Sequence, residues 1–301
     1  MTYIIENANI LKDQKLTKSS LLIENGKISS IKPIFKKYRH MRMDADPYIM
    51  TPSPILFTKE IPGDLSFQEI KKYYIQEYIL KGSTAFLTMA TVKHEYEVHV
   101  EIKKLKIRLL NCPVDYIIGV RCPIRLITQS FMRRCKREKV PAVFVDIQCV
   151  DELYEIPWGW IREAMFPYNS PLIPMFINNK EKENKQAKVE WKRIMEEEKI
   201  PCVPDELVEN QPISYPVRSQ IGIFPLKSSI HQGCELSYNL YLKSNEIRKI
   251  DEEELFHNHR NKLVITVHKG EVIRVKDEVI FRPGFGEHVK INTPSFYKID
   301  V

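Results

Sequence analysis

Residues 66–90 read SFQEIKKYYIQEYILKGSTAFLTMA. Apolar residues recur at helical spacing up to residue 81, and Ser66 stands where an N-cap is expected. Gly82 ends the predicted helix, and the apolar run after it predicts a buried strand. A helix that leads directly into a buried strand is the repeating unit of a parallel sheet with crossover helices.

The same alternation continues along the middle of the chain. Further helices are predicted at 94–106, 125–138 and 157–166, and further strands at 114–120, 141–148 and 171–177. Residues 179–199 predict a charged helix, and residues 201–216, which carry four prolines, predict a loop. The middle of the chain is therefore expected to form an α/β domain.

Both ends of the chain are instead rich in β-strand patterns. Strands are predicted at 3–10, 21–31 and 48–57, the last interrupted by Pro52 and Pro54. Further strands are predicted at 236–242, 263–268 and 271–275, with Asn25-Gly26 and Lys269-Gly270 as turns. This order fits an incomplete TIM-like (β/α) barrel inserted in a composite β-sandwich that both termini build. The predicted boundaries are 1–52 and 220–301 for the β domain and 53–219 for the barrel.

The amino-acid composition and the net charge exclude several classes of protein. The 301 residues are 43% hydrophobic and 28% charged, which allows a large core. The net charge of +7 is mild for this length and does not favour a nucleic-acid partner. The N-terminal residues lack a secretory pattern, the six cysteines form no C-x-x-C pair, and no apolar stretch reaches the ~18 residues of a membrane span. We expect a reduced, soluble, cytoplasmic protein that contacts no membrane.

Several strings resemble the cyclic amidohydrolases, particularly the dihydropyrimidinases and hydantoinases, with the dihydroorotases nearby. The strings are LLIENGKISSI at 21–31, KGSTAFLT at 81–88, GIFPLKSSIHQGCELSYNLYL at 222–242 and VITVHKGEVIRVKDEVIFRPGFGEHV at 264–289, together with residues 43–56 and 114–156. They occur in the family's order. The resemblance implies a barrel with a composite β domain, hydrolysis of cyclic amides by one or two divalent metals, usually zinc, and assembly into oligomers.

Each residue that aligns with one of the family's metal ligands differs from that ligand. Thr58 and Glu60 align with the first two histidines, after Leu56 in place of an aspartate, Phe144 aligns with the bridging lysine, and Ile177 aligns with a later histidine. Phenylalanine and isoleucine cannot coordinate a metal. We therefore expect no metal, no cofactor and no catalytic residues of the family type. Residues 53–219 are also fewer than the ~200–250 that a complete barrel takes.

The main hypothesis is a catalytically degenerate amidohydrolase-like protein with a structural, regulatory or binding role, as a homo-oligomer or in complex with another protein. One alternative is a hydrolase of the non-peptide C–N bonds of cyclic amides, metal-dependent or with a relocated site. Thr58, Lys59, Glu60 and Arg121 are the candidate pocket residues. The other is nucleic-acid binding through the basic helix 125–139, which carries Arg133, Arg134, Lys136, Arg137 and Lys139 but no recognised motif. The sequence does not identify a small-molecule ligand.

Overall fold

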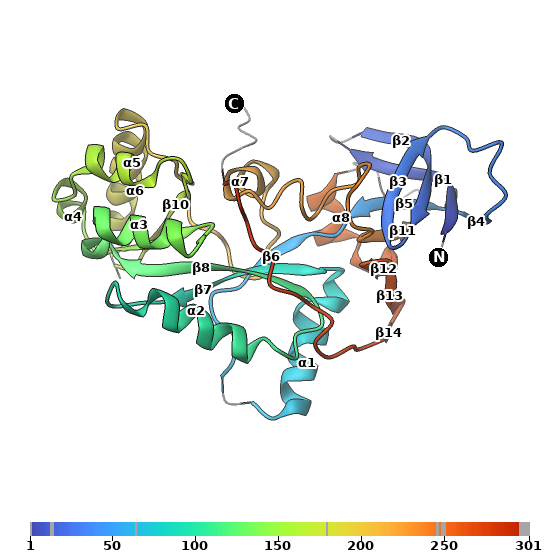
Figure 1. Ribbon diagram of the computed structural model, residues 1–301, viewed down its shortest axis with the longest axis horizontal. Helices are drawn as coiled ribbons and strands as arrows, with labels where there is room; N and C mark the ends of the chain where they lie inside the picture. The colour runs from blue at the N-terminus through green and yellow to red at the C-terminus, as the bar shows by residue number, and fades with distance from the viewer. Residues whose placement is uncertain are drawn as a thin grey trace.

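The computed structural model describes residues 2–12, 15–63, 65–178, 180–244, 247 and 251–294. These residues form two sheets, with the helices packed mostly on the parallel one. The other sheet is antiparallel except where β1 (Thr2–Lys12) pairs with β4 (Met41–Asp44) and β5 (Tyr48–Pro52), and we call it the antiparallel sheet. Figure 1 shows the antiparallel sheet at the right and the parallel sheet with its helices at the left. The predicted fold class, a TIM-like α/β unit beside a β-sandwich-like unit, is confirmed.

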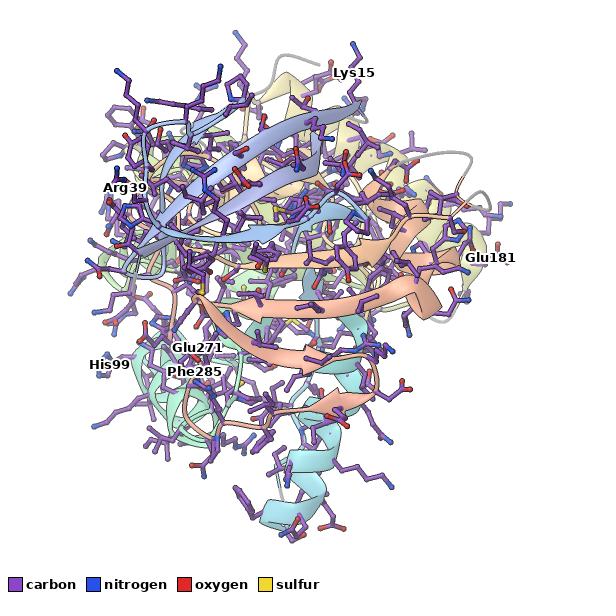
Figure 2. All side chains as sticks on the ribbon, turned by 90° about the vertical axis from the view of Figure 1, so that its right-hand side faces the viewer. Lys15, Arg39, His99, Glu181, Glu271 and Phe285 are labelled. Carbon is purple, nitrogen blue, oxygen red and sulfur yellow. The ribbon has the colours of Figure 1, made fainter. Side chains whose placement is uncertain are left out.

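The antiparallel sheet takes strands from both ends of the chain. Its order is β14-β13-β12-β11-β5-β1-β2-β3, and β4 pairs with β1. The N-terminal strands are β1 (Thr2–Lys12), β2 (Lys15–Glu24), β3 (Lys27–Lys32), β4 (Met41–Asp44) and β5 (Tyr48–Pro52). The C-terminal strands are β11 (Tyr238–Leu242), β12 (Leu263–His268), β13 (Glu271–Val275) and β14 (Glu278–Val279). The two groups meet where β11 pairs with β5, so neither end completes the sheet alone (Figure 2).

The parallel sheet has five strands among the described residues, in the order β10-β9-β8-β7-β6. The strands are β6 (Ile55–Phe57), β7 (Ala85–Thr91), β8 (Asp115–Pro123), β9 (Val143–Ile147) and β10 (Leu172–Phe176). The helices between them are α1 (Phe67–Glu77), α2 (Glu97–Arg108), α3 (Gln129–Arg137), α4 (Asp151–Tyr154) and α5 (Trp158–Met165), and α6 (Glu181–Glu197) follows β10. Short 3-10 helices lie at 79–81, 124–126 and 260–262. The strands form a curled half-barrel rather than the closed eight-stranded barrel of complete members of the fold.

The start of α1 confirms the predicted cap. Ser66 Oγ accepts from the backbone N–H of Glu69, and the Glu69 carboxylate accepts from the Ser66 N–H at 2.9 Å. This reciprocal capping box satisfies donors that the first helical turn leaves unpaired. The helix ends before residue 81, because its last turn tightens into the 3-10 helix that stops at left-handed Gly82.

The strand predicted at 48–57, with an interruption at Pro52 and Pro54, is broken at that point. It is two strands, since β5 belongs to the antiparallel sheet and β6 to the parallel one. Pro52 and Pro54 explain the break, because a proline has no N–H to continue a ladder. This Pro-Ser-Pro linker joins the two units of the molecule.

The Pro-rich segment 201–213 closes the open side of the half-barrel. At one end, Leu172 of β10 donates to Pro201 O and Val203 donates back to Leu172 O. At the other end, Phe57 of β6 donates to Gln211 O and Ile213 donates to Ile55 O. The segment therefore covers both strand edges of the parallel sheet. The helix that follows it, α7 (Tyr215–Ile221), was not predicted.

Residues 284–291, which we call the C-terminal strap, cross the amino ends of the parallel strands. Gly286 N donates to Cys112 O at 2.9 Å, and Tyr116 of β8 exchanges backbone hydrogen bonds with Glu287 and Val289 at 3.0 and 2.9 Å. The approach at Gly286 is close enough that an added Cβ would lie 1.9 Å from Val114 O. Only a glycine fits there without displacing the strap.

Gly286→Ala is therefore expected to lower the free energy of unfolding by about 1–3 kcal/mol, as over-packing does elsewhere. Urea unfolding followed by circular dichroism measures the change. Gly159→Ala is the matched control. Gly159 lies within α5, and the nearest atom that its new Cβ would meet is 4.0 Å away. That control should raise stability by up to about 1 kcal/mol. Equal changes in the free energy of unfolding for both substitutions would contradict the close contact between the strap and residue 114.

Candidate functional site

The inner face of the half-barrel is filled with apolar side chains. Alternation along the strands turns one set of residues inward, and these form one buried cluster. The cluster consists of Ile55, Phe57, Ala85, Leu87, Met89, Ile117, Ala142, Phe144, Ile173, Met175, Val203, Ile213, Ile221, Ile223 and Ile291. At its centre the rings of Phe57 and Phe144 stack with centroids 5.2 Å apart and an interplanar angle of 18°. The segment 201–213, α7 and the strap thus help to plug this interior.

Five residues at the carboxyl ends of the strands continue the inward set, and we call them the rim. They are Lys59, Thr91, Arg121, Asp146 and Ile177. The carboxyl ends of the strands are where active sites of this architecture lie. Arg121 Nε donates to Asp146 Oδ1 at 2.7 Å, between side chains that are 21% and 16% exposed. The rim therefore holds two cations and one carboxylate, and that carboxylate is already paired.

The four predicted pocket residues do not share one face. Lys59 and Arg121 belong to the rim, but the Thr58 side chain points to the helix side of the sheet. Its Oγ1 lies 2.9 Å from the hydroxyl of Tyr78, and Thr58 is 1% exposed. Burial raises the pKa of Tyr78 well above its usual value, so this hydroxyl stays protonated and is no general base. Glu60 is exposed after the strand.

The expected alignment with the family's ligands shifts by one residue in β6. Leu56 packs in the cluster between the sheet and the helices, as Thr58 does, so Phe57 and Lys59 are the residues that face inward. Phe144 faces inward as expected, and Ile177 continues the inward set of β10. With either alignment the residues present do not fit the divalent metal that the resemblance implies. A carboxylate that already accepts from Arg121 is a poor cation ligand.

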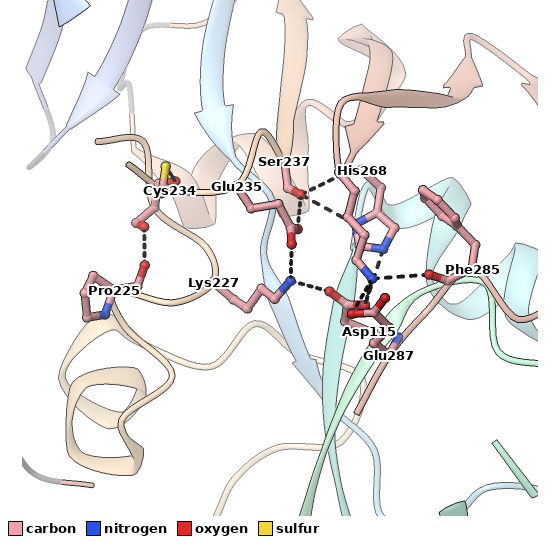
Figure 3. Close-up of polar contacts among 11 residues, drawn as sticks. Asp115, Pro225, Lys227, Cys234, Glu235, Ser237, His268, Phe285 and Glu287 are labelled. Atoms are coloured by element: carbon pink, nitrogen blue, oxygen red, sulfur yellow. Dashed lines mark hydrogen bonds and ion pairs between the residues drawn. The ribbon is translucent and has the colours of Figure 1, made fainter. Parts of the chain in front are cut away.

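Within the described ranges, one group of three His, Cys, Asp or Glu ligand atoms lies close together, and it lies at the other end of the strands. It consists of Asp115, Glu235 and His268, with the three ligand atoms within 4.8 Å of one another. Asp115 begins β8, at the amino edge of the parallel sheet, so the group lies at the junction with the antiparallel sheet (Figure 3). The amino edge is associated with stability rather than catalysis in barrels.

Two lysine side chains already form ion pairs with the carboxylates of this group. Lys227 Nζ bonds to Asp115 and lies 2.7 Å from Glu235, and Lys269 Nζ lies 2.8 Å from Asp115 Oδ1. The backbone N–H of Glu287, in the strap, also donates to Asp115 at 2.8 Å. Two ammonium groups repel a metal ion, so we interpret these residues as an ionic joint between the two sheets.

The charges of the joint keep Asp115 ionised. Burial alone would raise the pKa of the Asp115 carboxyl group, but the neighbouring His268 and Lys227 hold it well below its usual range. Burial would likewise lower the pKa of Lys227, but Asp115 and Glu235 raise it. The joint is thus a buried group of charges that depend on one another.

Sequence reasoning missed both Asp146 and the ionic joint. Asp146 lies two residues after Phe144, so strand alternation could have placed it on the inner face. Asp115 had no local signal, because its partners Lys227 and Lys269 lie more than a hundred residues further along the chain.

The basic helix is less available than its sequence suggests. Arg134 pairs with Glu95 at 3.2 Å, and Lys136 donates to the carbonyl oxygens of Ala164 and Phe166. Lys139 also donates to Asn292 Oδ1 at 2.6 Å, so three of the five basic residues bond to neighbouring segments, which weakens the nucleic-acid alternative. None of the described helices is both long and apolar enough to cross a membrane.

The remaining histidine and serine motifs form local contacts. His257 and His259 lie at the end of α8 (Glu252–Asn258), and His259 is 3.8 Å from Glu254. Ser229 Oγ lies 3.1 Å from His231 Nδ1, but its hydroxyl also donates to Pro225 O at 2.7 Å. A hydroxyl that donates to a carbonyl is not poised to give its proton to the histidine, so no activated serine results.

No protein-family model and no curated protein sequence matches the chain. Solved structures do match it. The dihydropyrimidinase from Brevibacillus agri NCHU1002 has a TM-score of 0.60 at 12% identity, over 97% of this chain and 99% of that chain. The L-hydantoinase (dihydropyrimidinase) from Arthrobacter aurescens has a TM-score of 0.65 at 13% identity, over 96% of this chain and 100% of that chain. The D-hydantoinase from a Bacillus sp. AR9 has a TM-score of 0.58 at 11% identity, over 97% of this chain and 99% of that chain. The chain therefore has the fold of the dihydropyrimidinases and hydantoinases, as the resemblance of its sequence predicted.

Proposed function

We propose that this protein is a non-hydrolysing relative of the dihydropyrimidinases and hydantoinases, with a structural, regulatory or binding role. One observation carries the proposal: the only carboxylate among the five rim residues, Asp146, is bonded to Arg121 above an apolar interior. Metal-assisted hydrolysis needs a bound water whose pKa is lowered to about 7, and several ligands must hold that metal. The rim supplies no such set.

The filled interior beneath the rim supports the same proposal. The Phe57 and Phe144 side chains stack beneath the rim, where a hydrolase would need room for a metal and a cyclic substrate. Both are fully buried, so they pack against the rest of the cluster. A filled interior suits a scaffold that acts through its surface. Self-assembly or binding to another protein remains the predicted way in which such a scaffold acts.

We expect the purified protein to bind Zn²⁺ and Mn²⁺ no more tightly than its Asp146→Asn variant does, and to leave dihydrouracil and hydantoin intact. Metal titration by calorimetry and substrate consumption in metal-supplemented buffer measure both, with an active hydantoinase as positive control. Stoichiometric metal binding that Asp146→Asn abolishes, together with hydrolysis, would refute the proposal. Hydrolysis that only Glu60→Ala abolishes would instead support the relocated-site alternative.

A further inference from the structure

A cavity of about 850 Å³ lies between the antiparallel sheet and the helices α7 and α8. It opens beside the Pro-Ser-Pro linker, since both Pro52 and Pro54 line it, and so it lies at the amino end of β6 rather than at the rim. Its volume falls in the range of small-molecule sites, which occur preferentially where two structural units meet.

Much of the cavity wall is apolar and aromatic. Leu11, Ile213 and Ile230 contribute aliphatic surface, and Tyr215, Phe224 and Phe256 contribute rings. Tyr215 and Phe224 meet edge to face, with centroids 4.9 Å apart. Such a wall suits an apolar or aromatic side chain of a ligand.

A pair of opposite charges lies in the same wall. Arg218 of α7 is 4% exposed, and its Nη2 donates to Glu252 Oε2 of α8 at 3.1 Å. Its Nη1 bonds to Ser228, and its guanidinium carbon lies 6.0 Å from the centre of the Tyr215 ring. These contacts fix the orientation of the guanidinium before any ligand binds.

The hydrogen-bonding edge of Arg218 is only half used. Nε–H and one Nη2–H of a guanidinium point in parallel, which lets them bind both oxygens of one carboxylate. Glu252 engages Nη2, whereas Nε has no partner among the described residues. The Arg218–Glu252 ion pair therefore lacks the two-bond geometry that the Nε and Nη2 edge offers. The Glu252 side chain is also 42% exposed.

We propose that this cavity binds a free α-amino acid with an apolar or aromatic side chain. The carboxylate of the ligand bonds to the Nε and Nη2 edge of Arg218. Its ammonium group pairs with Glu252, which turns away from Arg218, and its side chain packs on Tyr215, Phe224 and Phe256. The inference does not depend on whether the rim is catalytic.

A zwitterion fits this wall better than a single charge does. A plain anion would displace Glu252 and leave an acidic group unpaired beside Glu253, and a plain cation would leave Arg218 buried without a counter-charge. An unpaired buried charge is costly. A ligand that carries both charges replaces one partly exposed ion pair by two, and partly exposed ion pairs are weak enough to open.

Calorimetry with L-phenylalanine and L-leucine tests the proposal. We expect saturable binding of both, and at least about tenfold weaker binding of N-acetyl-L-phenylalanine and L-phenylalaninamide, which each lack one charge. Ser214→Trp should abolish binding, because exposed Ser214 lines the cavity and makes no side-chain cap for α7. Ser214→Ala is the matched control and should bind as the wild type does. Thermal unfolding of both variants shows that they are folded.

Each other outcome overturns the proposal. Failure of both amino acids to bind at about 10 mM removes the site. Equal binding of N-acetyl-L-phenylalanine indicates a site for anions, and equal binding of L-phenylalaninamide indicates a site for cations. Binding that survives in a folded Ser214→Trp variant places the amino acid elsewhere. None of these results bears on hydrolysis at the rim, so the proposed function is tested separately.

Discussion

Asp115→Asn is expected to lower the free energy of unfolding by about 3–5 kcal/mol, the cost of breaking a buried ion pair from one side. The Asp115 side chain is fully buried, and the side chains of Lys227 and Lys269 are 13% and 15% exposed. Loss of the carboxylate leaves two ammonium groups close together with only Glu235 and Glu287 as counter-charges. Equilibrium unfolding in urea at pH 7 measures the change.

The control for this substitution is Glu101→Gln. Glu101 pairs with Lys104 at 2.6 Å on an exposed face of α2, so its loss should cost less than about 1 kcal/mol. A similar loss in both variants would mean that the ionic joint is no stronger than a surface pair.

The joint also predicts a pH dependence. The pKa of Asp115 is lower in the folded protein than in the unfolded chain, where it is about 3.9. Its carboxylate therefore stabilises the fold above about pH 4, and this stabilisation is lost as the pH falls toward the folded pKa. The wild type should lose stability more steeply below pH 4 than Asp115→Asn does.

Phe144→Ala is expected to cost about 3–5 kcal/mol, because it removes a large side chain from the centre of a filled interior. Phe144 is fully buried, stacks on Phe57, and lies against Gly119, where an added Cβ would meet its ring at 2.7 Å. Urea unfolding again measures the loss.

Phe144→Leu is the graded control, because leucine keeps most of the volume, and we expect it to cost less than about 1.5 kcal/mol. An alanine variant as stable as the wild type would show that the interior beneath the rim is not packed. The proposal of a non-hydrolysing protein would then lose the support that it takes from the filled interior.

The order of elements could be predicted from the sequence, because each depends on local signals. Ser66 and Gly82 mark the ends of the first helical segment, and the apolar runs after each helix mark the parallel strands. Pro52 and Pro54 predicted the interruption between β5 and β6, but the apolar pattern on both sides of them does not show that the two strands belong to different sheets. The helix α7 was missed because Pro216 was interpreted as part of a loop, whereas proline is tolerated in a first helical turn.

The candidate site could be predicted only in part, because it depends on which face each side chain takes. Thr58 and Lys59 are neighbours in sequence, yet one contacts Tyr78 on the helix side and the other belongs to the rim. A shift of one residue exchanges the two faces of a strand, and no alignment of short strings fixes that shift. The cavity beside Arg218 could not be predicted at all, because its walls come from segments far apart in the chain.

The pairing of β5 with β11 has a consequence for synthesis on the ribosome. The edge of β5 that receives β11 cannot be covered until Tyr238–Leu242 has been made, after the whole parallel sheet. The N-terminal strands therefore emerge first and wait with an unpaired edge while the middle of the chain folds. Such an edge is open to pairing with another chain. We expect nascent chains that stop before residue 238 to be the aggregation-prone species, and chaperones that shield strand edges to act on them.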